Sequence, residues 1–222
     1  IFDQEDTKKK VDLIALASYR RAISNFVSIV TGESDIKVTF TTAGDSYTNG
    51  KEVTISSKLD DKLFDSTVGL ALHEGSHIKL SDFDFLRQLD TNIPQEYYRK
   101  GEDKGLSSSD VLGKIHNLLN YVEDRRIDYF IFSNSPGYKG YYHSMYDKYF
   151  HSKIIDKALQ TDEHTSLNWD SYLFRIINLT NTNSDLNVLP GLKDIHNVIF
   201  SNVKNLNSTQ EAFKVALQVF DI

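Results

Sequence analysis

Residues 65–80 read DSTVGLALHEGSHIKL, and the rest of the chain is interpreted outward from this stretch. Asp65 or Ser66 is a good N-cap, and the apolar residues that follow predict a helix to the end of the stretch. His73 and His77 stand four residues apart, so a helix presents both imidazoles on one face. The sequence therefore predicts a helix on which two histidines can grip one metal ion.

The segment His73-Glu-Gly-Ser-His77 has the HExxH pattern. Zinc accepts two such imidazoles and needs a third ligand and an open water position. Glu74 lies about 100° round the helix, where it can take a proton from metal-bound water and deliver it to a leaving group. A chain of this composition contains the pattern by chance only about 0.01 times. The alternative is a core helix with two partly buried histidines and Glu74 in solvent.

The third ligand must come from elsewhere in the chain. An extended HExxHxxGxxH pattern would need glycine and histidine at the positions of Leu80 and Phe83. The chain contains no cysteine, so thiolate ligands, disulfides and thiol catalysis are excluded as well. We therefore expect a carboxylate or a histidine from a later helix.

The segment 120–128, NYVEDRRID, is the best donor of a carboxylate. On a helix Glu123 shares its row with apolar residues such as Ile127 and points to the core, where a metal would neutralise its charge. Asp124 is the second choice; it shares a more polar edge with Asp128, and either could hold the second N–H of a ligand imidazole. The alternative is a solvated charged face with Glu–Arg pairs.

Apolar periodicity and turn residues predict an α+β fold that is predominantly helical. A helix over residues 6–30 is expected to end at Gly32, and residues 36–56 to form a small antiparallel β-hairpin before the HExxH helix. Residues 90–109 are interpreted as a loop. Further helices are predicted at 82–89, 110–132, 141–159, 168–180, 191–205 and 208–220. We expect residues 1–160 to form the core domain and residues 161–222 a helical C-terminal extension, joined to the core by a soft boundary.

Two other segments each have a functional and a structural interpretation. Residues 137–146 are rich in aromatic side chains: a tyrosine or His143 from this segment either stabilises an oxyanion or, as we favour, packs beneath a loop. The strand Lys51 to Ser56 either pairs with an extended substrate as an edge strand or is purely structural.

Composition limits the remaining functions. The 222 residues carry 25 basic and 31 acidic side chains, a net charge of −6, so a nucleic-acid partner is unlikely on charge grounds. No apolar run approaches the length of a membrane span, and no signal peptide is visible at the start. We expect a cytoplasmic protein of a bacterium or of a phage-infected cell, or a virion component. Because the chain lacks an initiating methionine, we expect it to be part of a longer polypeptide with further domains or assembly partners.

HEGSH followed 46 residues later by Glu-Asp on a second helix resembles the gluzincin type of zincin metallopeptidases. More narrowly, NYVEDRRID is similar to the N-x-x-E-D-x-R-I-[DE] signature of metallopeptidase-like domains that precede von Willebrand A-type domains in bacteria and large bacteriophages. The resemblance covers residues 36–132. It implies a zincin-like fold, His73, His77 and Glu123 as zinc ligands, and Glu74 as the general base.

One departure concerns the residue four positions after the ligand glutamate. Gluzincins have an acidic group there, whereas this chain has Ile127. The expected activity is zinc-dependent hydrolysis of peptide bonds in a peptide or protein substrate. The rival expectation is a non-catalytic structural or interaction module, for example in a phage particle, that keeps the zincin fold.

Overall fold

The computed structural model describes the backbone of residues 2–41, 44–56 and 63–222, and the side chains of these ranges from residue 17 onward. The described chain forms two compact units, each built from two separate segments. The first contains residues 1–79 and 134–148, and the second contains residues 80–133 and 149–222. The sequence analysis predicted a domain boundary after residue 160. The compact units divide the chain elsewhere, and the predicted boundary between domains stays a prediction.

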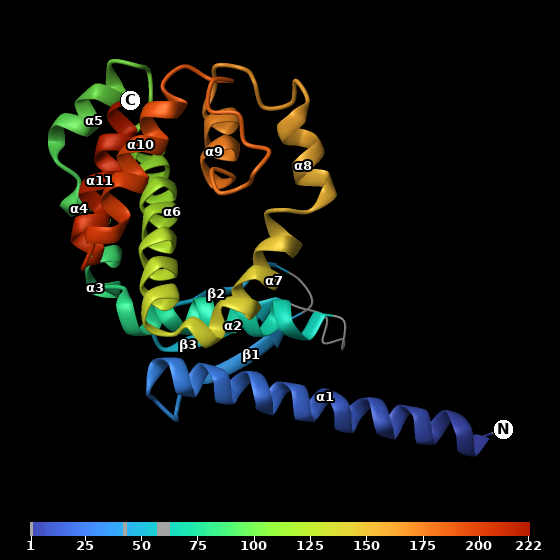
Figure 1. Ribbon diagram of the computed structural model, residues 1–222. Helices are drawn as coiled ribbons and strands as arrows, with labels where there is room; N and C mark the ends of the chain where they lie inside the picture. The colour runs from blue at the N-terminus through green and yellow to red at the C-terminus, as the bar shows by residue number, and fades with distance from the viewer. Residues whose placement is uncertain (1, 42–43, 57–62) are drawn as a thin grey trace. The chain divides into compact units, whose positions relative to one another are not determined.

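The first unit holds a three-stranded sheet in the order β1-β3-β2 (Figure 1). β1 (Lys37–Thr41) pairs in parallel with β3 (Glu52–Ser56), and β2 (Tyr47–Thr48) pairs antiparallel with β3. The expected β-hairpin is therefore only partly correct, because β1 and β3 run in the same direction. The true hairpin joins β2 to β3, and β3 is the central strand. Its backbone is paired on both sides at Val53 and Thr54, so the expectation that it is an edge strand free for substrate is wrong.

The turn of this hairpin lies where its sequence predicts it. The Asn49 side chain accepts hydrogen bonds from the backbone N–H groups of Lys51 and Glu52 at 2.9 and 3.0 Å. Gly50 has a φ of +88°, which a residue without a Cβ adopts at low cost. The turn brings β3 back beside β2 shortly before the HExxH helix begins.

The described part of the first unit also contains the α-helices α1 (Phe2–Thr31), α2 (Phe64–Leu80) and α7 (Lys139–Tyr149). The predicted helices at 6–30 and 65–80 are confirmed as α1 and α2, and Gly32 follows α1 with a φ of +77°. α2 and α7 each extend to the boundary with the second unit. The buried apolar residues of this unit come from α1, β3, α2 and α7, and include Ile23, Val27, Val53, Ile55, Val68, Leu72, Tyr142 and Met145.

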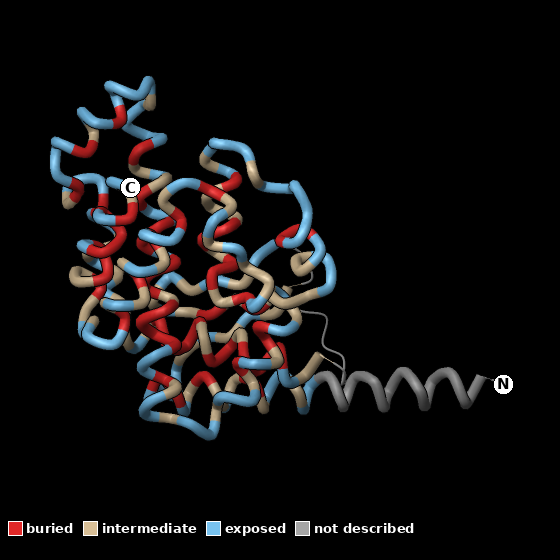
Figure 2. The backbone as a smooth tube through the Cα atoms, turned by 45° about the horizontal axis from the view of Figure 1, so that its top comes forward, coloured by how far each residue is buried: buried red, intermediate tan, exposed pale blue. Residues whose placement is uncertain are grey.

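The second unit is helical throughout its described elements. It contains α3 (Phe83–Arg87), α4 (Leu89–Asn92), α5 (Gln95–Glu102), α6 (Ser108–Asn134), α8 (Lys153–Gln160), α9 (Trp169–Ile177), α10 (Leu192–Asn202) and α11 (Thr209–Asp221). One apolar cluster joins α6 to α5, α9, α10 and α11, and Figure 1 shows α10 and α11 lying along α6. Figure 2 shows buried positions alternating with exposed ones along the chain, and the connection between α9 and α10 is itself buried at Leu179, Asn181 and Leu189.

α6 begins with a reciprocal cap. The Ser107 hydroxyl accepts from the backbone N–H of Asp110, and the Asp110 carboxylate accepts from the backbone N–H of Ser107. This is the capping-box arrangement, with aspartate in place of the usual glutamate. The long helix predicted from Asp110 therefore starts one half-turn earlier than expected.

Two expectations about the helices are wrong. Residues 90–109 contain α4 and α5 rather than a loop, because the breakers stand at helix ends: Pro94 occupies the N-cap of α5, and Gly105 follows it with a φ of +75°. The helix expected over 141–159 is divided into α7 and α8, since Ser152 adopts an extended backbone at the N-cap of α8. Among the described residues no helix combines the length and apolar character that a membrane crossing requires.

Candidate metal centre

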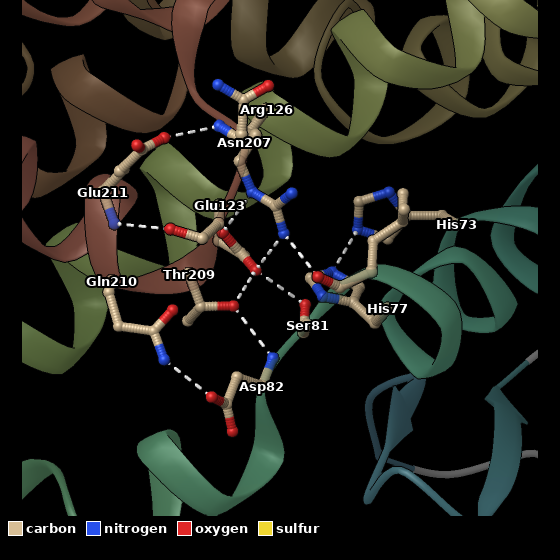
Figure 3. A network of polar contacts seen from close by, with 12 residues as sticks. His73, His77, Ser81, Asp82, Glu123, Arg126, Asn207, Thr209, Gln210 and Glu211 are labelled. Carbon is tan, nitrogen blue, oxygen red and sulfur yellow. Dashed lines mark hydrogen bonds and ion pairs between the residues drawn. The ribbon is translucent and has the colours of Figure 1, made fainter.

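His73 and His77 lie on α2 with their Nε2 atoms facing each other 3.3 Å apart (Figure 3). Their ring centroids are 4.9 Å apart and the ring planes meet at 82°. Two nitrogens that each lie about 2.0–2.1 Å from one tetrahedral ion are separated by about 3.3–3.4 Å. The spacing of the two imidazoles therefore matches the bite that tetrahedral chelation needs.

Glu74, the residue after His73, is buried, with 9% of its surface exposed. The alternative that placed Glu74 in solvent is therefore wrong. A buried carboxylate is costly unless it is partnered, and burial also strengthens its interaction with a nearby charge because the local dielectric is low.

Gly75, between the two histidines, lets α1 approach α2. A Cβ atom built on Gly75 would lie 2.7 Å from Cγ1 of Val30. The missing side chain therefore makes room for a helix of the same unit. It also leaves the backbone of α2 flanked by α1 along the HExxH turn.

α7 packs against α2 on another side and brings Tyr142 next to His73. Tyr142 is fully buried, and its ring lies 6.3 Å from the His73 ring at 69°. Its hydroxyl is 3.3 Å from Ser76 Oγ, and Ser76 donates to the Leu72 carbonyl at 2.6 Å. Since the single hydroxyl hydrogen of Ser76 is used, Tyr142 is the donor to Ser76. The aromatic segment 137–146 thus packs as a helix rather than as a loop, and His143 is exposed.

The carboxylate of Glu123 is the hub of a polar network in the second unit (Figure 3). Glu123 is 2% exposed. Its Oε1 accepts from Ser81 and Thr209, both at 2.8 Å, and from Arg126 Nη2 at 2.6 Å. Its Oε2 accepts from Arg126 Nε at 2.8 Å. A carboxylate has about four acceptor positions, and four donors are directed at this one.

Sequence reasoning placed Glu123 correctly on the core side of α6 and named Glu–Arg pairs in its alternative, but it missed the two hydroxyl partners. Arg126 stands at i+3 from Glu123 and is 4% exposed, so the spacing alone allowed the pair to be expected. Ser81 and Thr209 are 42 and 86 residues away from Glu123 in the chain. No periodic signal connects such distant hydroxyls with one carboxylate.

The charged stretch of α6 is not the solvated face that the alternative required. Arg125 and Asp128 are 8% and 5% exposed, and Arg125 Nη2 lies 3.0 Å from Asp128 Oδ2. The Arg125 guanidinium is also 5.1 Å from the ring centre of Tyr121. Burial raises the pKa of Tyr121 to about 12, so this phenol stays neutral beside the charges.

Asp124 is half-buried on α6, one residue after Glu123. His73, His77 and Asp124 are a group of described residues that could hold a metal ion, offering two imidazole nitrogens and one carboxylate oxygen. This donor set suits several divalent transition metals, zinc among them.

Comparisons of the chain with protein-family models, with curated proteins and with solved structures find no match.

Proposed function

We propose that this chain is a metal-dependent hydrolase of peptide bonds, with zinc as the metal, His73 and His77 as two of its ligands and Glu74 as the general base. The observation that carries the proposal is the 3.3 Å separation of the two Nε2 atoms on α2. Two ligands of one ion must direct their nitrogen atoms at the same point, as these two Nε2 atoms do. The buried position of Glu74, inside the same helical turn, supports its catalytic role.

In this proposal each residue has a limited task. Zinc bound by imidazoles acidifies water and polarises a carbonyl group. Glu74 accepts the proton of the attacking water and transfers it to the amine that leaves. Ser76 and Tyr142 hold the His73 side of α2 through their hydrogen bond, so that the imidazole keeps its direction.

We propose Asp124 rather than Glu123 as the third ligand. Four donor atoms are directed at Glu123, three at Oε1 and one at Oε2, and two of them belong to the buried Arg126 guanidinium that balances its charge. A metal at Glu123 would place a second positive charge next to the buried Arg126 guanidinium, and like charges repel strongly where the dielectric is low. Asp124, in contrast, belongs with His73 and His77 to the group that could hold an ion.

Metal content tests the proposed ligands. We expect elemental mass spectrometry of the protein, purified after growth with zinc, to find about one zinc per chain, and His77→Ala to lose it because one ligand remains on α2. His116→Ala is the matched control, since His116 is an exposed histidine of α6. Equal zinc in wild type and His77→Ala would contradict the proposal.

Hydrolysis is tested on the same samples with fluorescein-labelled casein. We expect wild-type cleavage to stop on treatment with a chelator and to return with zinc. A protein that binds zinc at His73 and His77 but cleaves neither casein nor a mixed peptide library would favour the non-catalytic module instead.

A further inference from the structure

We propose that Glu123, Arg126 and Thr209 form an exit clamp, a set of positioning residues that fixes the end of the HExxH helix and the turn of α6 that carries Asp124. This inference rests on the proposed function, because it assigns these residues a role at the same metal centre. It gives Glu123 a different task from the ligand role that the resemblance implies.

The exit clamp holds the three consecutive residues 80–82, which begin three positions after His77. The carbonyl of Leu80, the last residue of α2, accepts from Arg126 Nη2 at 2.7 Å. The hydroxyl of Ser81 donates to Glu123, and the backbone N–H of Asp82 donates to Thr209 Oγ1 at 2.8 Å. Each of residues 80–82 is therefore fixed by a different bond to α6 or α11 (Figure 3).

Arg126 is well suited to this position. The last carbonyls of a helix have no partner inside the helix, and a cation is favoured at its C-terminal end. Glu123 holds the guanidinium through both of its oxygens, which fixes the plane of the fork. The orientation of the hydrogen bond from Arg126 to the Leu80 carbonyl is therefore fixed as well as its length.

Thr209, the first residue of α11, connects this helix to Asp82 and Glu123. It is 1% exposed, accepts from Asp82 and donates to Glu123 at 2.8 Å. Asp82 in turn caps α3 by accepting from the backbone N–H of Phe85. This bond and a second one from Gln210 lower the pKa of Asp82, so the cap stays ionised.

The consequence for the metal follows from the continuity of α2. His77 lies three residues, less than one helical turn, before Leu80, so the clamp fixes the backbone at the end of α2 within one turn of the histidine pair. Glu123 and Arg126 flank Asp124 on α6. The same bonds therefore fix both the end of α2 and the turn of α6 that offers the third carboxylate.

The test compares metal affinity among conservative variants, measured by competition with a chromophoric chelator, together with the visible absorption spectrum of the cobalt(II) protein. Loss of a residue that supports metal ligands lowers metal affinity by about 10- to 100-fold. We expect Glu123→Gln, Arg126→Lys and Thr209→Val each to weaken zinc binding within this range and to keep the cobalt spectrum of a four-coordinate site. Asp124→Asn should change that spectrum, because it replaces a ligand.

The matched control is Arg175→Lys. Arg175 is a fully buried arginine of α9 that also donates to backbone carbonyls, those of Leu159, Glu163 and His164. It has no bond to residues 80–82 among those of the described chain. We expect Arg175→Lys to lower resistance to urea without changing metal affinity, which separates positioning from a general loss of stability.

Three outcomes would decide against the exit clamp. Zinc affinity within twofold of wild type in all three clamp variants would remove its positioning role. A changed cobalt spectrum in Glu123→Gln with a normal one in Asp124→Asn would make Glu123 the ligand, and the proposed function would stand. Undiminished zinc binding in His77→Ala would instead show that the proposed function itself is wrong.

If Glu123→Gln fails to fold, the zinc affinity of Thr209→Val decides the question. Valine has nearly the shape of threonine and leaves the Glu123–Arg126 pair in place.

Discussion

Replacing Glu74 with glutamine is expected to leave zinc bound and to lower turnover by about 100- to 10,000-fold, the usual contribution of a general base. Glutamine has the shape of glutamate but cannot accept a proton from water. His73 and His77 keep their 3.3 Å spacing in this variant, so the metal site should be unaffected. The measurement is cleavage of fluorescein-labelled casein beside metal content in the same preparation.

The control for this experiment is Glu96→Gln. Glu96 is an exposed glutamate of α5, so the same chemical change there should alter neither activity nor zinc content. Full activity in Glu74→Gln would rule out Glu74 as the base. A variant that loses zinc as well would assign Glu74 to metal binding.

The second large effect is expected at Gly69, where α7 crosses α2. A Cβ atom at this position would clash with the backbone oxygen of Tyr141 and would lie 2.8 Å from Cβ of Met145. A backbone oxygen can move only if α7 shifts, and overpacking of this kind costs about 1–3 kcal/mol. We expect Gly69→Ala to lower the free energy of unfolding by about 2 kcal/mol, measured by urea denaturation of the metal-free protein.

Gly113→Ala is the matched control for this substitution. Gly113 also lies inside a helix, α6, but a Cβ atom there would meet nothing within 4 Å. Alanine is a better helix former than glycine by about 0.5–1 kcal/mol, so this variant should be more stable than wild type. Equal stability gains in the two variants would show that α7 does not press on α2 at Gly69.

The two predictions concern the same helix for different reasons. Glu74 is predicted from its place in HExxH, and its chemistry follows from residue type and spacing. The importance of Gly69 follows only from the neighbour that lies over it. In the sequence Gly69 is a helix-disfavouring residue in an apolar stretch, and nothing nearby indicates which segment it admits.

The sheet illustrates the same limit. Residues 36–56 have the β-branched alternation and the Asn49-Gly50 turn that predict strands, and the strands are present. Alternation does not encode the direction of pairing. The short β2 takes the antiparallel place beside β3, and β1 pairs in parallel from the other side.

By itself the sequence determined the helix of residues 65–80, the buried long helix around Glu123 and the pairing of His73 with His77, because these depend on periodicities within one helix. The tertiary structure alone decided what surrounds them. Glu123 faces the core as its apolar row predicts, yet its four donors come from α6, from the residue after α2 and from α11. Hydrogen bonds depend on positions in space, and residues separated by 42 and 86 positions acquire those positions only when the helices pack.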